Sequence, residues 1–141
     1  MSRNDPYRGF RFHVEFDHVL HGGFSRVKGL IRETKIESRR EGGVNDYEHK
    51  LVTQTSYGNL ILERGLVNPY LWSWHDDVVA GNTVTRRTLT IVLNDESDQE
   101  VWRWLVERAY PVKWSGTDLD AGATQVVVES VEFAHEGIRK G

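Results

Sequence analysis

Residues 37–51 read ESRREGGVNDYEHKL, and this stretch decides how the rest of the chain is interpreted. It lies in a connection, residues 38–57, that is much longer than the roughly two to five residues that usually join neighbouring strands. A solvated surface loop is one interpretation, and a projecting arm that contacts another copy of the protein is the other. Tyr47 and Leu51 favour the arm, because apolar anchors have no use in a purely solvated loop.

The predicted contact residues combine charges of both signs with those anchors and a glycine pair suited to a sharp turn. We expect inter-subunit contacts through Glu37, Arg39, Arg40, Glu41, Gly42, Gly43, Asp46, Tyr47, Glu48, Lys50 and Leu51. The strand predicted just before them, residues 31–39, has no apolar face. Such a strand has a weakly specified register on its own. We therefore expect it to pair inside a larger sheet, with one side facing water and the other a charged partner.

Alternating apolar and polar residues predict further strands on both sides of this region. The clearest is residues 10–16, in which Phe12, Val14 and Phe16 share one face with Phe10. The other predicted strands are residues 24–30, 59–64, 86–93, 101–112 and 125–136. The pattern predicts a mainly β fold, a β-sandwich or flattened antiparallel barrel of about six to seven strands.

One helix is predicted over residues 68–80. Asn68 is a suitable N-cap, Pro69 suits the first helical position, and Gly81 is placed to end the helix. We expect the helix to cover one open end of the barrel. Its expected buried stripe comprises Leu71, Trp74 and Val78, broadened by Trp72, His75 and Val79.

Length and composition limit the alternatives. The chain has 141 residues, which suits one domain, and it has no cysteine. Its 18 basic residues are scattered and outnumbered by 21 acidic ones, so no sequence-specific nucleic-acid binding is expected. No apolar run is long enough to span a membrane, and the N-terminal residues lack the apolar segment of a secretory signal. We therefore expect assembly in the cytoplasm and no stable membrane insertion.

No motif for catalysis, a cofactor or a metal is apparent. His18 and His21 flank a predicted turn but lack an obvious third metal ligand. Five tryptophans leave open a rival function, a small-ligand or carbohydrate-binding β-barrel module. That function would need an open cavity lined by Trp72, Trp102 or Trp104. An enzyme is a further alternative, for which no specific residue pattern argues.

Several stretches together resemble the tail tube proteins of T4-type contractile phages and of extracellular contractile injection systems. They are DPYRGFRFHVEF (5–16), GGFSRVKGL (22–30), REGGVNDYEHKL (40–51), LERGL (62–66), AYPVKWSGTDLDAG (109–122) and VESVEFAHEGI (128–138). The resemblance covers residues 5–138 in the same order. His18 and His21 depart from it, because smaller or aliphatic residues are expected in the first turn.

The resemblance implies a structural, non-enzymatic protein that is akin in fold to the ring-forming haemolysin-coregulated protein of type VI secretion. Six copies would form a ring, and rings would stack into a hollow inner tube within a contractile sheath. The tube would carry DNA or protein cargo into a target cell, as part of a phage tail or an extracellular particle. Its partners would be the sheath protein, baseplate or spike proteins and tube-terminating proteins.

The resemblance also organises the chain as a single tail tube domain, residues 1–141. We expect an N-terminal arm (1–9), because Pro6 favours extended chain before it, and an extended inter-subunit loop (38–57). Within that loop, residues 39–51 match the family's loop to neighbouring subunits and the next ring. The polar strand before the loop would then face the lumen or a ring neighbour. This second candidate surface comprises Arg32, Glu33, Thr34 and Lys35.

Overall fold

The computed structural model describes residues 9–39, 49–81, 85–116 and 126–141, which form nine strands and one helix. In chain order they are β1 (Phe12–Phe16), β2 (Val19–Lys28), β3 (Arg32–Arg39), β4 (His49–Tyr57), β5 (Leu60–Val67), α1 (Pro69–Val79), β6 (Arg87–Asn94), β7 (Glu100–Gly116), β8 (Val126–Ala134) and β9 (Gly137–Lys140). The predicted N-terminal arm, residues 1–9, lies outside the described residues except for Gly9. No helix in the described ranges is long and apolar enough to cross a membrane.

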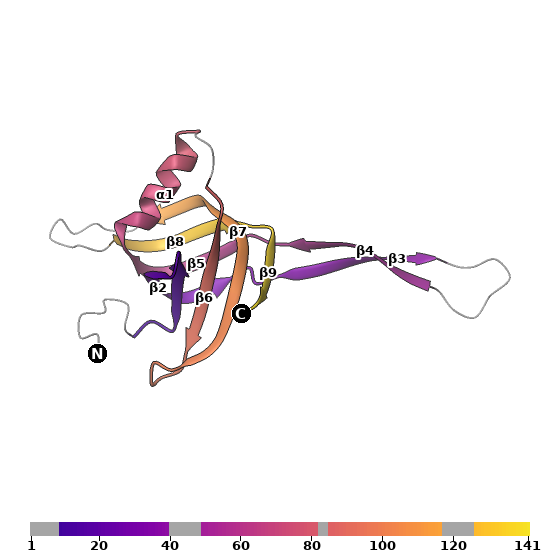
Figure 1. Ribbon diagram of the computed structural model, residues 1–141, viewed down its shortest axis with the longest axis horizontal. Coiled ribbons are helices and arrows are strands. Elements are labelled where there is room, and N and C mark those ends of the chain that lie inside the picture. Colours follow the sequence, from indigo (N-terminus) through magenta and orange to yellow (C-terminus); the bar gives the residue numbers. More distant parts are fainter. Residues whose placement is uncertain (1–8, 40–48, 82–84, 117–125) are drawn as a thin grey trace.

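Six strands close into an antiparallel barrel in the order β6-β1-β2-β5-β8-β7, because β6 also pairs with β7. Closure leaves these six strands without open sheet edges between them. Strand β7 is long enough to pair with β8 along its second half and with β9 along its first half. The predicted barrel is therefore confirmed, and β9 is an additional strand that the sequence pattern did not predict (Figure 1).

The barrel core is built from the apolar faces that alternation predicts. In β1, Val14 and Phe16 are buried and Phe12 packs against the core from its edge. The side chains that are fully buried at the centre include Phe24, Leu60, Leu62, Leu89, Ile91, Val106, Val128, Val131 and Phe133. Burial of such side chains supplies the main driving force for folding.

In two strands, β5 and β7, the alternation of buried and exposed side chains shifts by one residue part-way along the strand. In β5 the buried side chains are Leu60 and Leu62 before Arg64, and Val67 after it. Arg64 has a positive φ of 54° and Arg108, at a β-bulge in β7, has a φ of 50°. A residue in this conformation breaks the strict alternation of a strand and lets it bend. The bends allow each strand to follow the barrel wall.

The helix α1 begins and ends as predicted. The Asn68 side chain accepts a hydrogen bond from the backbone N–H of Tyr70 at 3.2 Å, and Pro69 is the first helical residue. Gly81 follows the last turn with a φ of 74° and donates to the carbonyl of Val78. The cap chemistry in the sequence thus fixes both boundaries.

The buried stripe of α1 is narrower than predicted. Leu71 and Trp74 are buried, whereas Trp72 and Val79 are exposed. Trp74 reaches the core beside Phe133, with ring centroids 5.8 Å apart. The helix packs on the barrel by one edge only, so residues about 100° away from Leu71 around the helix face outward. The expectation that Trp72 and Val79 broaden the buried stripe was wrong.

The largest departure from the predicted fold concerns β3 and β4. Residues 31–39 were expected inside a larger sheet, but β3 pairs with β4 in a separate two-stranded sheet. Residues 49–57, predicted as part of an extended loop, form β4. Because Ile36 is the one apolar residue in the sequence of β3, neither face is apolar enough to pack on a core, and the pair projects from the barrel (Figure 1). We call this two-stranded sheet the arm.

Candidate assembly surface

The arm is a regular antiparallel ladder with one irregularity. The pairs run from Arg32 opposite Tyr57 at the barrel to Arg39 opposite His49, with a shift between Lys35 and Ile36. The side chains from residue 32 to 38 and from 51 to 55 are all exposed. Isolated two-stranded sheets are at best marginally stable in water. The arm therefore has little to stabilise it except the backbone ladder and any contacts it makes beyond its own chain.

The two faces of the arm differ in chemistry. Residues directly opposite each other share a face, so Ile36 and Val52 lie side by side, 54% and 75% exposed. Next to them, the hydroxyls of Thr34 and Thr55 lie 2.9 Å apart in a hydrogen bond. Together with Arg32, these form a mainly apolar and hydroxyl surface without a carboxylate. We call it the ridge face: Arg32, Thr34, Ile36, Val52 and Thr55.

The opposite face is charged. Glu33, Lys35 and Glu37 alternate along β3 on this side, and Leu51 lies opposite Glu37 on β4. The predicted surface of Arg32, Glu33, Thr34 and Lys35 is thus divided between the two faces, because adjacent strand residues point in opposite directions. All four lie on the half of β3 nearer the barrel.

The structure places four of the predicted inter-subunit residues on the arm. Glu37 and Arg39 are in the outer half of β3, and Lys50 and Leu51 are in β4. The register brings these positions together, with Glu37 opposite Leu51. The remaining predicted residues lie outside the described ranges: Arg40, Glu41, Gly42, Gly43, Asp46, Tyr47 and Glu48.

The root of the arm is held by polar contacts with the end of β8. His135 contacts the carbonyl oxygen of Gly58 through its Nε2 at 2.7 Å, and its ring meets Tyr57 edge-on at 5.7 Å. Burial lowers the pKa of His135 from its ordinary value, although the nearby backbone hydrogen bonds at Gly58 and Gly137 oppose the shift. The neutral ring, with Nε2–H donating to Gly58, is therefore the form that holds the arm root near neutral pH.

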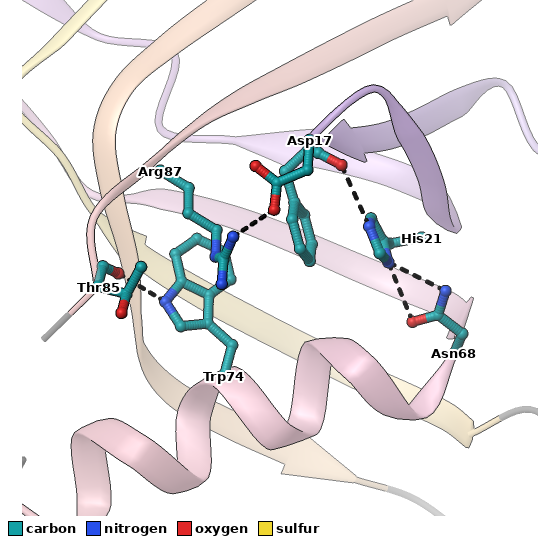
Figure 2. A network of polar contacts seen from close by, with 7 residues as sticks. Asp17, His21, Asn68, Trp74, Thr85 and Arg87 are labelled. Atoms are coloured by element: carbon teal, nitrogen blue, oxygen red, sulfur yellow. Dashed lines mark hydrogen bonds and ion pairs between the residues drawn. The ribbon is translucent and has the colours of Figure 1, made fainter.

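A second polar network fixes α1 on the barrel (Figure 2). The Arg87 guanidinium lies 5.4 Å from both the Phe16 and the Trp74 ring centroids and pairs with Asp17. The Trp74 indole N–H donates to the carbonyl of Thr85 at 2.7 Å. This network joins the β1–β2 turn, the middle of the helix and the start of β6.

His21 belongs to the same region as this network. It lies in β2 and is buried, stacked on Phe16 with ring centroids 3.6 Å apart. Its Nδ1 contacts the Asn68 side chain, and its Nε2 lies 3.2 Å from the Phe16 carbonyl. His18 is exposed in the turn. Across the described residues, no group of three or more His, Asp or Glu side chains is arranged to hold a metal ion.

An open groove between the barrel and the arm root contains two of the tryptophans considered for ligand binding. It has a volume of about 380 Å³ and is lined by Trp102 and Trp104 together with Arg32, Arg139 and Lys140. The Lys140 ammonium lies 4.5 Å above the Trp102 ring. Trp72 is elsewhere and packs edge-on against Trp114, with centroids 4.9 Å apart.

Sequence reasoning missed β4, although a signal was available. The segment from His49 to Tyr57, HKLVTQTSY, contains Val52, Thr53, Thr55 and Tyr57, all residue types that favour strands. Its apolar residues do not alternate, because the bulge between Gln54 and Val52 interrupts the period of two. The contact between His135 and the arm root had no sequence signal, since 77 positions separate His135 from Gly58.

Solved structures share this architecture. A chain of the anti-feeding prophage (AFP) baseplate, solved by cryo-EM with 6-fold symmetrisation, is 31% identical, with a TM-score of 0.68 over 100% of this chain and 97% of that one. A chain of the sheath-tube complex of an extracellular contractile injection system, PVC, is 20% identical, with a TM-score of 0.68 over 99% and 93% of the two chains. Hcp1 from Flavobacterium johnsoniae shares the fold at 14% identity, with a TM-score of 0.51 over 94% and 95%.

No curated protein sequence matches the chain. The model of the family described as T4-like virus tail tube protein gp19 matches residues 8–139, almost the whole length. The barrel, the single helix and the arm all lie within the matched range. The chain therefore belongs to the T4-like virus tail tube protein family.

Proposed function

We propose that this tail tube protein forms rings of six copies, which stack into a hollow tube inside a contractile sheath. Family membership gives the chain a structural tube role. The six-fold number is supported by the similar chain in the AFP baseplate, which belongs to a 6-fold symmetrised assembly. The tube would deliver protein or DNA cargo into a target cell, without catalysis by the tube protein itself.

The observation that carries this proposal is the exposed arm. It extends beyond the barrel and presents apolar side chains, Ile36 and Val52, to solvent. A monomer gains nothing from exposing such residues on a marginal two-stranded sheet. Repeated contacts between copies would cover them, and the symmetry of a ring multiplies each contact.

We infer the partners of this protein from the assemblies in which similar chains occur. Similar chains occur in structures described as a baseplate, a sheath-tube complex and a tube-terminating cap. A tube of this protein would accordingly contact a sheath along its outside and be closed by baseplate and terminator proteins at its ends. Such particles would be assembled in the cytoplasm and act as a phage tail or an extracellular particle.

The rival function in carbohydrate binding has one observation in its favour, the groove beside Trp102. However, Lys140 already covers one face of the Trp102 ring, on which a sugar would stack. Titration of mono- and oligosaccharides against tryptophan fluorescence checks this function. Saturable quenching at millimolar sugar would support the rival.

Shortening the arm tests the proposal. Residues 36–53 are replaced by Asn-Gly, so that the pair of Lys35 and Gln54 is closed by a two-residue turn. We expect a folded barrel, whose β circular dichroism falls only by the share of the removed parts of β3 and β4, and which no longer forms long tubes by negative-stain electron microscopy. The parent chain is the control and should form rings or tubes at high concentration. Long tubes from the shortened chain, or a strictly monomeric parent, would contradict the proposal.

A further inference from the structure

We propose that the ridge face of the arm docks in a groove beside α1 of another copy. The groove lies between one side of the helix and the β1–β2 turn and has a volume of about 500 Å³. Phe16 and Trp74 form its buried apolar floor. This inference rests on the proposed function and adds the surface that receives the arm.

The ridge face exposes apolar side chains that nothing in the described part of a single copy covers, and the groove offers apolar surface on which they can pack. At its edges lie Val19, 52% exposed, and Tyr70, 71% exposed, which are among the most exposed apolar side chains of the barrel and helix. The corresponding residues on the arm are Ile36 and Val52. Packing β-branched side chains against the Tyr70 ring would remove apolar surface from water on both copies.

The groove is also rigid. Its wall is the network of Figure 2, in which Arg87 lies against the Phe16 and Trp74 rings and pairs with Asp17. The His21 ring, stacked on Phe16 and contacting Asn68, fixes the turn relative to the start of the helix. A preformed groove loses little conformational entropy when it is occupied.

Charge and spacing agree with this pairing. Within the described part of the chain, neither Arg32 on the ridge face nor Asp77 at the groove has an ion-pair partner. Ile36 and Arg32 are four residues apart on a strand, about 13 Å. Tyr70 and Asp77 are seven residues apart on a helix, about 10 Å. With Ile36 against Tyr70, the long Arg32 side chain therefore reaches Asp77.

Other grooves suit the arm less well. The groove beside Trp102 contains Arg32, Arg139 and Lys140, so it is cationic like the ridge face. Another, beside β6, sets Arg86, Arg87 and Arg103 against Glu15 and Asp17, so its cations outnumber its carboxylates. A third, at Arg64 and Glu129, balances its charges and contributes no net attraction. The groove beside α1 combines an apolar floor with a free carboxylate.

The geometry allows a heterologous contact. The arm and α1 occupy different sides of the barrel, so one copy can give its arm to one neighbour and receive the arm of another (Figure 1). Such contacts close into rings or continue along a stack, whereas a self-complementary patch would stop at a dimer.

Cysteine crosslinking tests the inference, and the chain has no native cysteine to interfere. The double variant Val52→Cys/Tyr70→Cys is assembled and treated with a short bismaleimide. We expect a ladder of covalent multimers on a denaturing gel, because every copy carries both halves of the contact. The matched control pairs Val52→Cys with Val101→Cys. Val101 is an exposed valine on β7 that does not line the groove, so this pair should give no ladder.

A charge exchange provides an independent readout. Arg32→Glu and Asp77→Arg should each reduce tube formation, and the double variant should restore it. Two results would overturn the docking site and leave the tube function intact. In the first, tubes form normally but only the Val52→Cys/Val101→Cys variant crosslinks. In the second, the Arg32→Glu/Asp77→Arg double variant forms no more tubes than the single variants. Failure of the unmodified chain to form rings or tubes would instead overturn the proposed function, and the docking site with it.

Discussion

The barrel and the arm are built from the same kind of antiparallel ladder but are stabilised differently. In the barrel, side chains such as Phe24, Leu62 and Phe133 are fully buried and the six strands close on themselves. In the arm, the side chains of residues 32–38 are all exposed. The difference teaches that the barrel can fold by its own burial, whereas the arm buries little apolar surface within a single copy.

The largest expected effect separates the two regions by stability. Phe133→Ala removes a fully buried ring that contacts Trp74, and should lower the free energy of unfolding by about 3–5 kcal/mol. Ile36→Ala on the arm should change it by no more than about 0.5 kcal/mol, because the side chain is exposed in the single copy. Urea unfolding of dilute monomer, followed by tryptophan fluorescence, measures both. An equal loss of unfolding free energy in both variants would show that the arm unfolds together with the barrel core. The contrast between the two regions would then be wrong.

An intermediate effect is expected at the junction of the two regions. Gly29 has a φ of 81° where β2 leads into the arm, and a Cβ there would overlap the carbonyl of Asn59. Gly29→Ala should therefore cost more than the roughly 1–2 kcal/mol of a left-handed alanine alone. Gly81→Ala is the matched control, because its φ of 74° is similar but nothing lies near the added methyl.

The two glycine variants are compared by thermal unfolding and by amide hydrogen exchange of β3 and β4. We expect Gly29→Ala to have the lower midpoint and faster exchange in the arm. Similar unfolding midpoints for the two variants would show that the backbone around Gly29 can move to accommodate a methyl group. The junction would then not fix the direction of the arm.

The smallest expected effect concerns pH at the arm root. The pKa of His135 in the folded protein lies below the value of 6.5 of the free side chain, because burial disfavours the charged ring. Its contribution to stability is therefore complete above pH 6.5 and is lost as the pH falls through the folded pKa. Protection factors of the amides near Gly58, that is, exchange rates corrected for their intrinsic pH dependence, should fall between pH 7 and pH 5 more than in a His135→Gln variant. A His135→Gln profile parallel to that of the parent chain would exclude His135 as the cause.

Much of the fold could be predicted because the relevant patterns are local. The alternation in residues 10–16 and the cap formed by Asn68 and Pro69 depend only on neighbouring residues, and the structure confirms both. The position of the arm could also be predicted, from the charges and apolar anchors in residues 37–51. Its pairing could not, because the bulge in β4 hides the alternation that marks a strand.

The sequence by itself determined a mainly β fold with one capped helix and an unusually long segment between two strands, since hydrophobic period, caps and glycines act over a few residues. Only the tertiary structure decided that β3 and β4 stand apart from the barrel, that His135 holds the arm root, and that His21 packs on Phe16 instead of facing solvent. The groove beside α1 also exists only because the β1–β2 turn and the helix meet. These features depend on contacts between residues far apart in the chain, which local patterns do not encode.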